Sequence, residues 1–125
     1  MSKEKYGLDH FEDEEFACKC GCGLNQMNLG FVQELNLARE WSGVQMVVNS
    51  GHRCVVHNAS DEVRGSSTSS HLKGLATDVQ CEDMANRADL IYNLLAVGIL
   101  RIGVYPTFLH IDNDKTKPRG IFPGE

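Results

Sequence analysis

The sequence predicts an α+β fold in which helices pack against a small, mainly antiparallel sheet. Two stretches, residues 28–42 and 83–97, place apolar residues at the spacing of an amphipathic helix. Shorter stretches rich in β-branched and aromatic residues are typical of strands, and they cover residues 44–49, 75–79, 100–105 and 107–112. At 125 residues the chain is long enough to bury a core, so we expect residues 1–125 to form a single domain.

Composition and charge argue against two classes of function. The apolar fraction of 42% and the charged fraction of 23% are ordinary for a soluble globular protein. A net charge of −5 gives little electrostatic support for nucleic-acid binding, and no apolar run is long enough to cross a membrane. Residues 1–7 lack the apolar core of a secretory signal peptide, so we expect synthesis in the cytoplasm. We also expect a monomer.

The N-terminal third contains one strong helix prediction. Residues 1–10 are polar and are expected to be irregular, with a short helical turn over residues 10–16. In the helix over residues 28–42, Asn28 is a suitable N-cap and Gly43 is a suitable end. We expect its buried stripe to consist of Leu29, Val32, Leu35, Ala38 and Trp41.

Three of the five cysteines, Cys18, Cys20 and Cys22, alternate ahead of this helix, so an extended backbone places them on one side. An odd number of cysteines without a signal peptide argues against a full disulfide framework. These cysteines could still bind a structural metal or form one disulfide. The other two cysteines, Cys54 and Cys81, have no close partner in the sequence, so a cysteine-rich turn is the favoured interpretation.

The C-terminal third supplies the second helix and two strands. The helix over residues 83–97 follows acidic residues that suit a helix N-terminus, and Gly98 suits its end. The two strands that follow are hinged at Pro106, and residues 114–125 are expected to be irregular. We expect the buried stripe of the helix to consist of Met84, Ala88, Ile91, Leu94 and Leu95.

The stretch from Ser69 to Asp78 carries the strongest functional signal. It places His71 and Asp78 seven residues apart with small residues between them. Imidazole nitrogen and carboxylate oxygen are good zinc ligands, and catalytic zinc takes three protein ligands plus water. His110 is the candidate third ligand. Gly74 is expected to be small because the backbone passes close to the metal.

The whole pattern is more specific than the pair of ligands. Residues 69–78 read Ser-x-His-x-x-Gly-x-Ala-x-Asp, residues 50–53 read Ser-Gly-His-Arg, and residues 108–112 read Phe-Leu-His-Ile-Asp. Together these motifs resemble the signature of the M15 zinc peptidases, the D-alanyl-D-alanine carboxypeptidase group, whose fold is shared with the hedgehog signalling domain. The resemblance covers about residues 10 to 113.

The resemblance implies a Zn²⁺ ion held by His71, Asp78 and His110, and a peptidoglycan stem peptide as substrate. It also implies that Arg53 grips a carboxylate of the substrate, since a guanidinium matches a carboxylate in a two-point fork. Ser69 could bond the substrate backbone or only shape its loop. His52 is expected at the surface. A small form without a signal peptide resembles phage or prophage lysins, which would reach the cell wall after release by another agent.

The chain departs from the better-known M15 enzymes at two positions. Thr107 stands where they have Asp or Glu three residues before the last histidine, and Tyr105 replaces a further histidine, so we place Tyr105 among the substrate-binding residues. Asp112 shares a strand face with His110 and is our candidate general base. Its alternative role is to orient a ligand histidine.

Two other classes of function stay open. A non-catalytic zinc-containing binding module of the same fold is favoured by Thr107. A structural metal protein built on Cys18–Cys22 would lose its metal when the cysteines are replaced and keep it when His71 is replaced.

Overall fold

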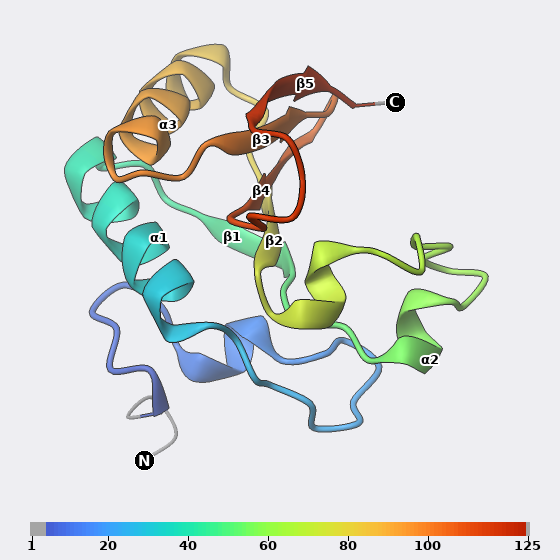
Figure 1. Ribbon diagram of the computed structural model, residues 1–125. Helices are drawn as coiled ribbons and strands as arrows, with labels where there is room; N and C mark the ends of the chain where they lie inside the picture. Colours follow the sequence, from blue (N-terminus) through green and yellow to red (C-terminus); the bar gives the residue numbers. More distant parts are fainter. Residues whose placement is uncertain (1–4, 125) are drawn as a thin grey trace.

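The chain alternates short helices and strands along residues 5–124, which are the residues that this computed structural model describes (Figure 1). This confirms the predicted α+β class. In chain order the elements are η2 (Asp13–Phe16), α1 (Leu29–Ser42), β1 (Val47–Ser50), α2 (Val55–Asn58), η3 (Ser70–Lys73), β2 (Ala76–Gln80), α3 (Met84–Ala96), β3 (Arg101–Val104), β4 (Phe108–Asp112) and β5 (Gly120–Pro123).

The strands form one twisted sheet in the order β1-β2-β4-β3-β5. All neighbouring pairs are antiparallel except β3 and β5, which run parallel. The mainly antiparallel sheet is therefore confirmed, but the expectation of an irregular tail over residues 114–125 is wrong for β5. This edge strand has only four residues and ends in a proline, so it gives almost no signal in the sequence.

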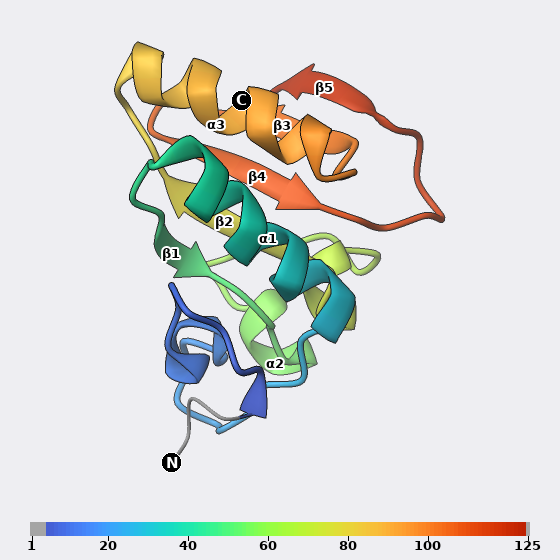
Figure 2. The same cartoon turned by 90° about the vertical axis from the view of Figure 1, so that its left-hand side faces the viewer.

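Helices α1 and α3 lie side by side and cover one face of the sheet (Figures 1 and 2). The N-cap of α1 is Asn28, whose side chain accepts a hydrogen bond from the Phe31 amide at 3.0 Å, and Gly43 closes the helix with a φ of 69°. Asp83 caps α3 in the same way through the Asn86 amide. The predicted caps at Asn28, Gly43 and Asp83 are confirmed because capping depends on local chemistry. Helix α3 ends at Ala96 with Val97 as its C-cap, just before the predicted end at Gly98.

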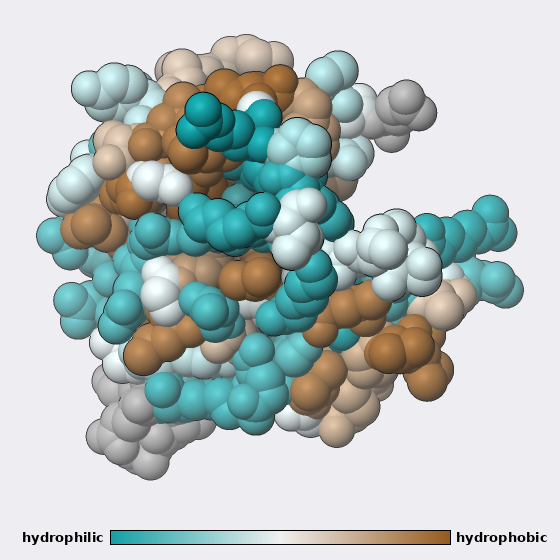
Figure 3. All heavy atoms as spheres, in the orientation of Figure 1, coloured by the Kyte–Doolittle hydropathy of each residue, from teal (hydrophilic) through white to brown (hydrophobic). Residues whose placement is uncertain are grey.

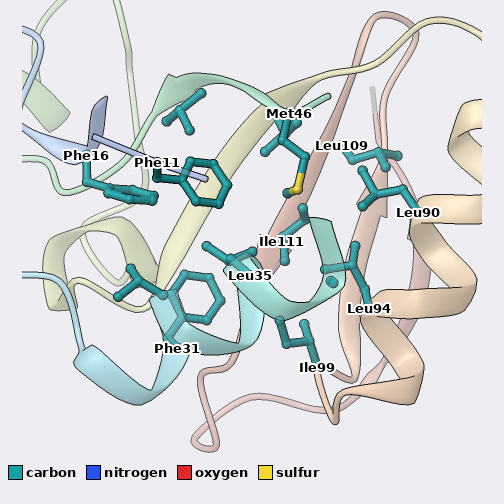
Figure 4. Close-up of a cluster of buried hydrophobic side chains, with 14 of the residues drawn as sticks. Phe11, Phe16, Phe31, Leu35, Met46, Leu90, Leu94, Ile99, Leu109 and Ile111 are labelled. Carbon is teal, nitrogen blue, oxygen red and sulfur yellow. The ribbon is translucent and has the colours of Figure 1, made fainter. Parts of the chain in front are cut away.

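The core lies between these helices and the sheet (Figure 4). Its fully buried side chains include Phe16, Phe31, Leu35, Met46, Leu90, Leu94, Ile99, Ile102, Leu109 and Ile111. None of the helices within residues 5–124 has both the length and the apolar character that crossing a lipid bilayer requires.

Both helices are rotated relative to the predicted stripes. In α1, Leu29 and Trp41 are 48% and 54% exposed, while Phe31 is fully buried. In α3, Met84 is exposed and Arg87 is buried in its place, with its Nε donating to the Cys81 carbonyl at 2.6 Å. An arginine can occupy a buried position when backbone carbonyls satisfy its guanidinium, and this is invisible to a hydrophobic pattern.

The N-terminal segment packs onto the body more tightly than expected. Residues 1–4 of the expected irregular segment lie outside the described residues. Tyr6 and Leu8 are buried, and the Tyr6 hydroxyl donates to Asn25 Oδ1 at 2.6 Å and accepts from the Met27 amide at 2.9 Å. The segment over residues 5–10 therefore has an irregular backbone but a fixed place in the core.

Helix α2 was not expected from the sequence. It places Val55 and Val56 in solvent at 73% and 80% exposure. Figure 3 shows hydrophobic, brown surface over α2. The helix follows directly on Arg53 and Cys54, so its position helps to fix where these two side chains lie.

Candidate active site

Asp78 and His110 are direct cross-strand partners in the β2–β4 pair. Their neighbours Leu109 and Ile111 point into the core beneath the helices, so alternation along the strand directs His110 to the opposite face. Asp78 Oδ1 lies 3.0 Å from His110 Nδ1. The strand register alone therefore brings two of the three predicted ligands together.

His71 comes from the short turn η3, which lies next to the start of β2. Ser69 opens the turn by accepting a hydrogen bond from the His71 amide at 3.2 Å. Gly74 closes it with a φ of 70°, and a Cβ there would lie 2.3 Å from the Gln26 carbonyl oxygen. This left-handed turn and the neighbouring backbone are enough to explain why the position holds glycine, whereas we expected the metal to require it.

The three predicted ligands form a set that fits zinc. One ligand atom from each of the three residues lies within 4.8 Å of the other two, and Asp78 Oδ1 is 3.4 Å from His71 Nε2. A tetrahedral zinc ion with bonds of about 2.0 to 2.1 Å separates its ligand atoms by about 3.3 Å. His71 Nδ1 donates to the Gly51 carbonyl at 2.7 Å, which leaves Nε2 with the lone pair that a metal requires.

Asp112 lies behind His110. Its Oδ2 is 2.8 Å from His110 Nε2, and its Oδ1 accepts hydrogen bonds from Arg101 Nε at 2.9 Å and from the Asp114 amide at 3.1 Å. The side chain is fully buried. These contacts are those of a group that fixes the tautomer and the direction of a ligand histidine, with His110 Nδ1 left for the metal.

The charges of the site depend on one another. Burial acts to raise the pKa of the Asp78 carboxyl, but hydrogen bonds from His110 and His71 outweigh it and hold that pKa well below its usual range. Burial acts to lower the pKa of His110, but Asp112 and Asp78 outweigh it and raise that pKa. A metal must displace a proton from His110, so its binding is expected to weaken in acid.

The metal-ligand group opens into a cavity of about 410 Å³. The predicted substrate residues Arg53, Ser69 and Tyr105 all line it, together with Phe108, Lys117 and Phe122. Thr107 is exposed at the β3–β4 turn and is not among the lining residues. Within the lining, Asp78 is the only carboxylate that the described residues contribute.

Arg53 is placed between the metal-ligand turn and the cavity. Its amide donates to the His71 carbonyl at 3.1 Å, and its NH2 group donates to Ser69 Oγ at 3.1 Å. Its Nε is buried and has no hydrogen-bond partner among the described residues. A buried guanidinium N–H without an acceptor is costly, so the described residues alone do not satisfy this side chain.

A family model described as Peptidase M15 matches residues 9–112, which include the three candidate ligands and Arg53. The chain belongs to the peptidase M15 family. Members of this family are typically zinc-dependent peptidases, and the M15 chain has a donor set suited to that metal. Neither the comparison with curated proteins nor that with solved structures found a match.

Sequence reasoning missed one wall of the M15 cavity. Phe122 on β5 pairs with Gly103 on β3, and its ring centroid lies 6.2 Å from that of His110. A Cβ at Gly103 would come within 2.6 Å of the Phe122 ring. A glycine inside a predicted strand indicates such a close approach, so Gly103 was the available signal.

The M15 chain contains a second group of possible metal ligands. The Sγ atoms of Cys18, Cys20, Cys22 and Cys54 lie within 4.8 Å of one another. The sequence interpretation gave Cys54 no close partner, because it lies 34 residues after Cys20 and only the fold brings the two together. His52 also differs from expectation. It is buried, and its Nδ1 accepts a hydrogen bond from the Gln26 amide at 2.9 Å.

Proposed function

We propose that this chain is a zinc peptidase that hydrolyses peptide bonds in peptidoglycan stem peptides, with Zn²⁺ held by His71, Asp78 and His110. One observation carries the proposal: two histidines with oriented rings and one carboxylate come together at a cavity that Arg53 also lines. When bound, zinc lowers the pKa of water towards about 7 and polarises a carbonyl, which is the chemistry that amide hydrolysis needs.

Arg53 is the proposed carboxylate-binding residue. Its Nε lacks an acceptor, and its NH2 group is held by Ser69, so the guanidinium is already oriented before the substrate arrives. Lys117 and Arg101 also line the cavity and make its charge complementary to an anionic peptide. Stem peptides of peptidoglycan carry free carboxylates, which suits this arrangement.

Aromatic rings supply the proposed contacts to the apolar part of the substrate. Tyr105 and Phe108 are stacked, with ring centroids 4.5 Å apart, and the Phe122 ring lies 6.2 Å from that of His110. Ser69 and Tyr105 both line the cavity, and we retain them as proposed substrate-binding residues. The D-Ala-D-Ala terminus and the internal bonds of the stem peptide are candidate scissile bonds, and the setting would be cell-wall degradation by a phage or prophage lysin.

For Asp112 we propose the positioning role in preference to the general base. Both of its oxygens accept hydrogen bonds from protein groups, and the residue does not line the cavity. A general base must reach the proton that it removes, directly or through one water. Arg101 and His110 hold the Asp112 carboxylate away from such a position.

The second candidate function is a zinc-containing binding module without catalysis. It is favoured by Thr107 and by the fact that Asp78, a proposed metal ligand, supplies the only carboxylate of the described cavity lining. A module of this kind would retain peptide in the cavity through Arg53 and the aromatic walls without cutting it.

The test is product analysis by mass spectrometry after incubation with purified stem pentapeptides and with whole peptidoglycan. We expect cleavage by the zinc-loaded protein, its loss in His110→Ala, and full activity in the control variant His10→Ala, which changes an exposed histidine on the N-terminal segment. Binding of peptide without any product from the zinc-loaded protein would establish the module and exclude the peptidase.

A further inference from the structure

We propose that Cys18, Cys20, Cys22 and Cys54 bind a second zinc ion, which is structural and distinct from the one at the candidate active site. Three of these thiols lie in the turn between η2 and α1, and the fourth precedes α2. The inference does not depend on the proposed peptidase function, because it rests on a separate set of ligands.

The sulfur positions match a tetrahedral thiolate site. Cys18 Sγ lies 3.5 Å from Cys20 Sγ, and Cys20 Sγ lies 3.7 Å from Cys54 Sγ. Zinc–sulfur bonds of about 2.3 Å in a tetrahedron separate the sulfurs by about 3.8 Å. A disulfide would require about 2.05 Å, and one disulfide would use only two of the four thiols. Four thiolates around one ion satisfy all of them.

The backbone around the cluster supplies hydrogen bonds and turns that suit thiolate ligands. The amide of Cys54 donates to Cys18 Sγ at 3.4 Å, and the amide of His57 donates to Cys54 Sγ at 3.3 Å. Such amide donors stabilise the negative charge of thiolate ligands. Gly21 and Gly23 have φ values of 86° and 90°, and the Cys18 amide donates to the Leu24 carbonyl at 2.8 Å. This turn curls the three cysteines towards Cys54.

The solvent exposure of the cysteines also supports a bound metal. Cys18 is buried and Cys54 is partly buried, whereas Cys20 and Cys22 are exposed. Exposed free thiols are open to oxidation and exchange, and a bound metal removes that reactivity. Cys81, the remaining cysteine, is buried away from the cluster and has no such neighbours among the described cysteines.

A metal bound by the four cysteines would stabilise the segment that carries two residues of the candidate active site. The cluster joins the turn after Phe16 to the segment over residues 51–54. That segment contains Gly51, whose carbonyl orients His71, and Arg53, which lines the cavity. Among the described residues, the backbone hydrogen bond that joins these two segments runs from the His52 amide to the Phe16 carbonyl, at 2.9 Å. Zinc would therefore fix two active-site residues without contacting the substrate.

The test is zinc content by plasma mass spectrometry of the intact chain, purified under reducing conditions. We expect about two zinc ions per chain in the wild type and one in the double variant C20S/C22S, which changes only exposed side chains. We expect one in His110→Ala and two in the control Cys81→Ala. Wild-type zinc content retained in C20S/C22S would overturn the proposal.

A spectroscopic measurement covers the case in which the double variant fails to fold. His110→Ala loaded with Co²⁺ isolates the cysteine site without changing any cysteine. Intense sulfur-to-cobalt charge-transfer absorption in the near ultraviolet is the expected result. The site would be excluded if the cobalt-loaded variant showed no such absorption and if all four thiols of the native, zinc-supplied protein reacted freely with an aromatic disulfide reagent. An intact mass showing a native disulfide within the cluster would also exclude it.

Discussion

Asp112 Oδ2 lies 2.8 Å from His110 Nε2, two residues away on the same strand, so a buried carboxylate stands directly behind the ring of a proposed zinc ligand. Replacing it by alanine leaves both His110 and Arg101 without their acceptor. We expect Asp112→Ala to weaken zinc binding by about 10- to 100-fold, with Asp112→Asn closer to wild type because its amide oxygen still accepts. Competition with a chromophoric chelator measures the affinity.

The same pair of variants separates the two roles of Asp112. If Asp112 were the general base, Asp112→Asn would bind zinc and substrate normally and lose turnover. A positioning role predicts instead that turnover recovers when zinc is supplied in excess. Asp89→Ala, an exposed aspartate on α3, is the matched control and should leave zinc affinity unchanged.

Arg53 should control recognition of a carboxylate. In Arg53→Lys the ammonium cannot make a two-point fork, so we expect KM to rise by about 10- to 100-fold for a substrate with a free carboxylate. For the wild type, amidation of that carboxylate should raise KM by the same factor. Amidation should have no further effect on KM in Arg53→Lys, because both changes remove the same contact. Arg64→Lys, in an exposed loop, is the control. Equal losses on both substrates would show that Arg53 has only a structural role.

Gly103 should be intolerant of a side chain because of Phe122. A Cβ at Gly103 would overlap the Phe122 ring at 2.6 Å, and we expect Gly103→Ala to reduce the free energy of unfolding by about 1 to 3 kcal/mol. Chemical denaturation measures this loss. In the double variant with Phe122→Ala the penalty should shrink, since the clashing ring is gone. If Gly103→Ala cost the same free energy of unfolding with and without the Phe122 ring, contact with that ring would not be the cause.

Asp114 should make stability depend on acid. Burial acts to raise its pKa, but hydrogen bonds from Thr116, Ser70 and Lys73 outweigh it and hold that pKa well below its usual range. Ionised Asp114 therefore stabilises the fold above the unfolded carboxyl value of about 4, and the stabilisation is lost as pH falls through and below that range.

The measurement compares wild type with Asp114→Asn, both without metal, by denaturation from pH 7 to pH 2. We expect the variant to be less stable at pH 7 and the difference to shrink steadily as pH falls below about 4. Ser70 donates to Asp114 Oδ2 at 2.7 Å, so the loosened η3 turn should also weaken zinc binding through His71. A difference that stays constant with pH would contradict this account.

Local chemistry made much of this structure predictable. The caps at Asn28 and Gly43 depend on neighbouring residues, and strand alternation places Asp78 and His110 on one face. The candidate metal ligands were thus predictable from their spacing together with the family resemblance. Cys54 and Phe122 could not be placed, because their partners lie far away in the chain. His52 was misjudged for the same reason, since its burial comes from Gln26 and Leu72.

The wall built by β5 has a consequence for how such a cavity could change over time. The segment that matches the family stops at residue 112, whereas Lys117 and Phe122 follow it and line the same cavity. The candidate metal ligands and part of the cavity wall therefore occupy consecutive, separable stretches of chain. Exchanging residues 113–124 between relatives could retune which peptide is accepted while the ligand framework is inherited intact.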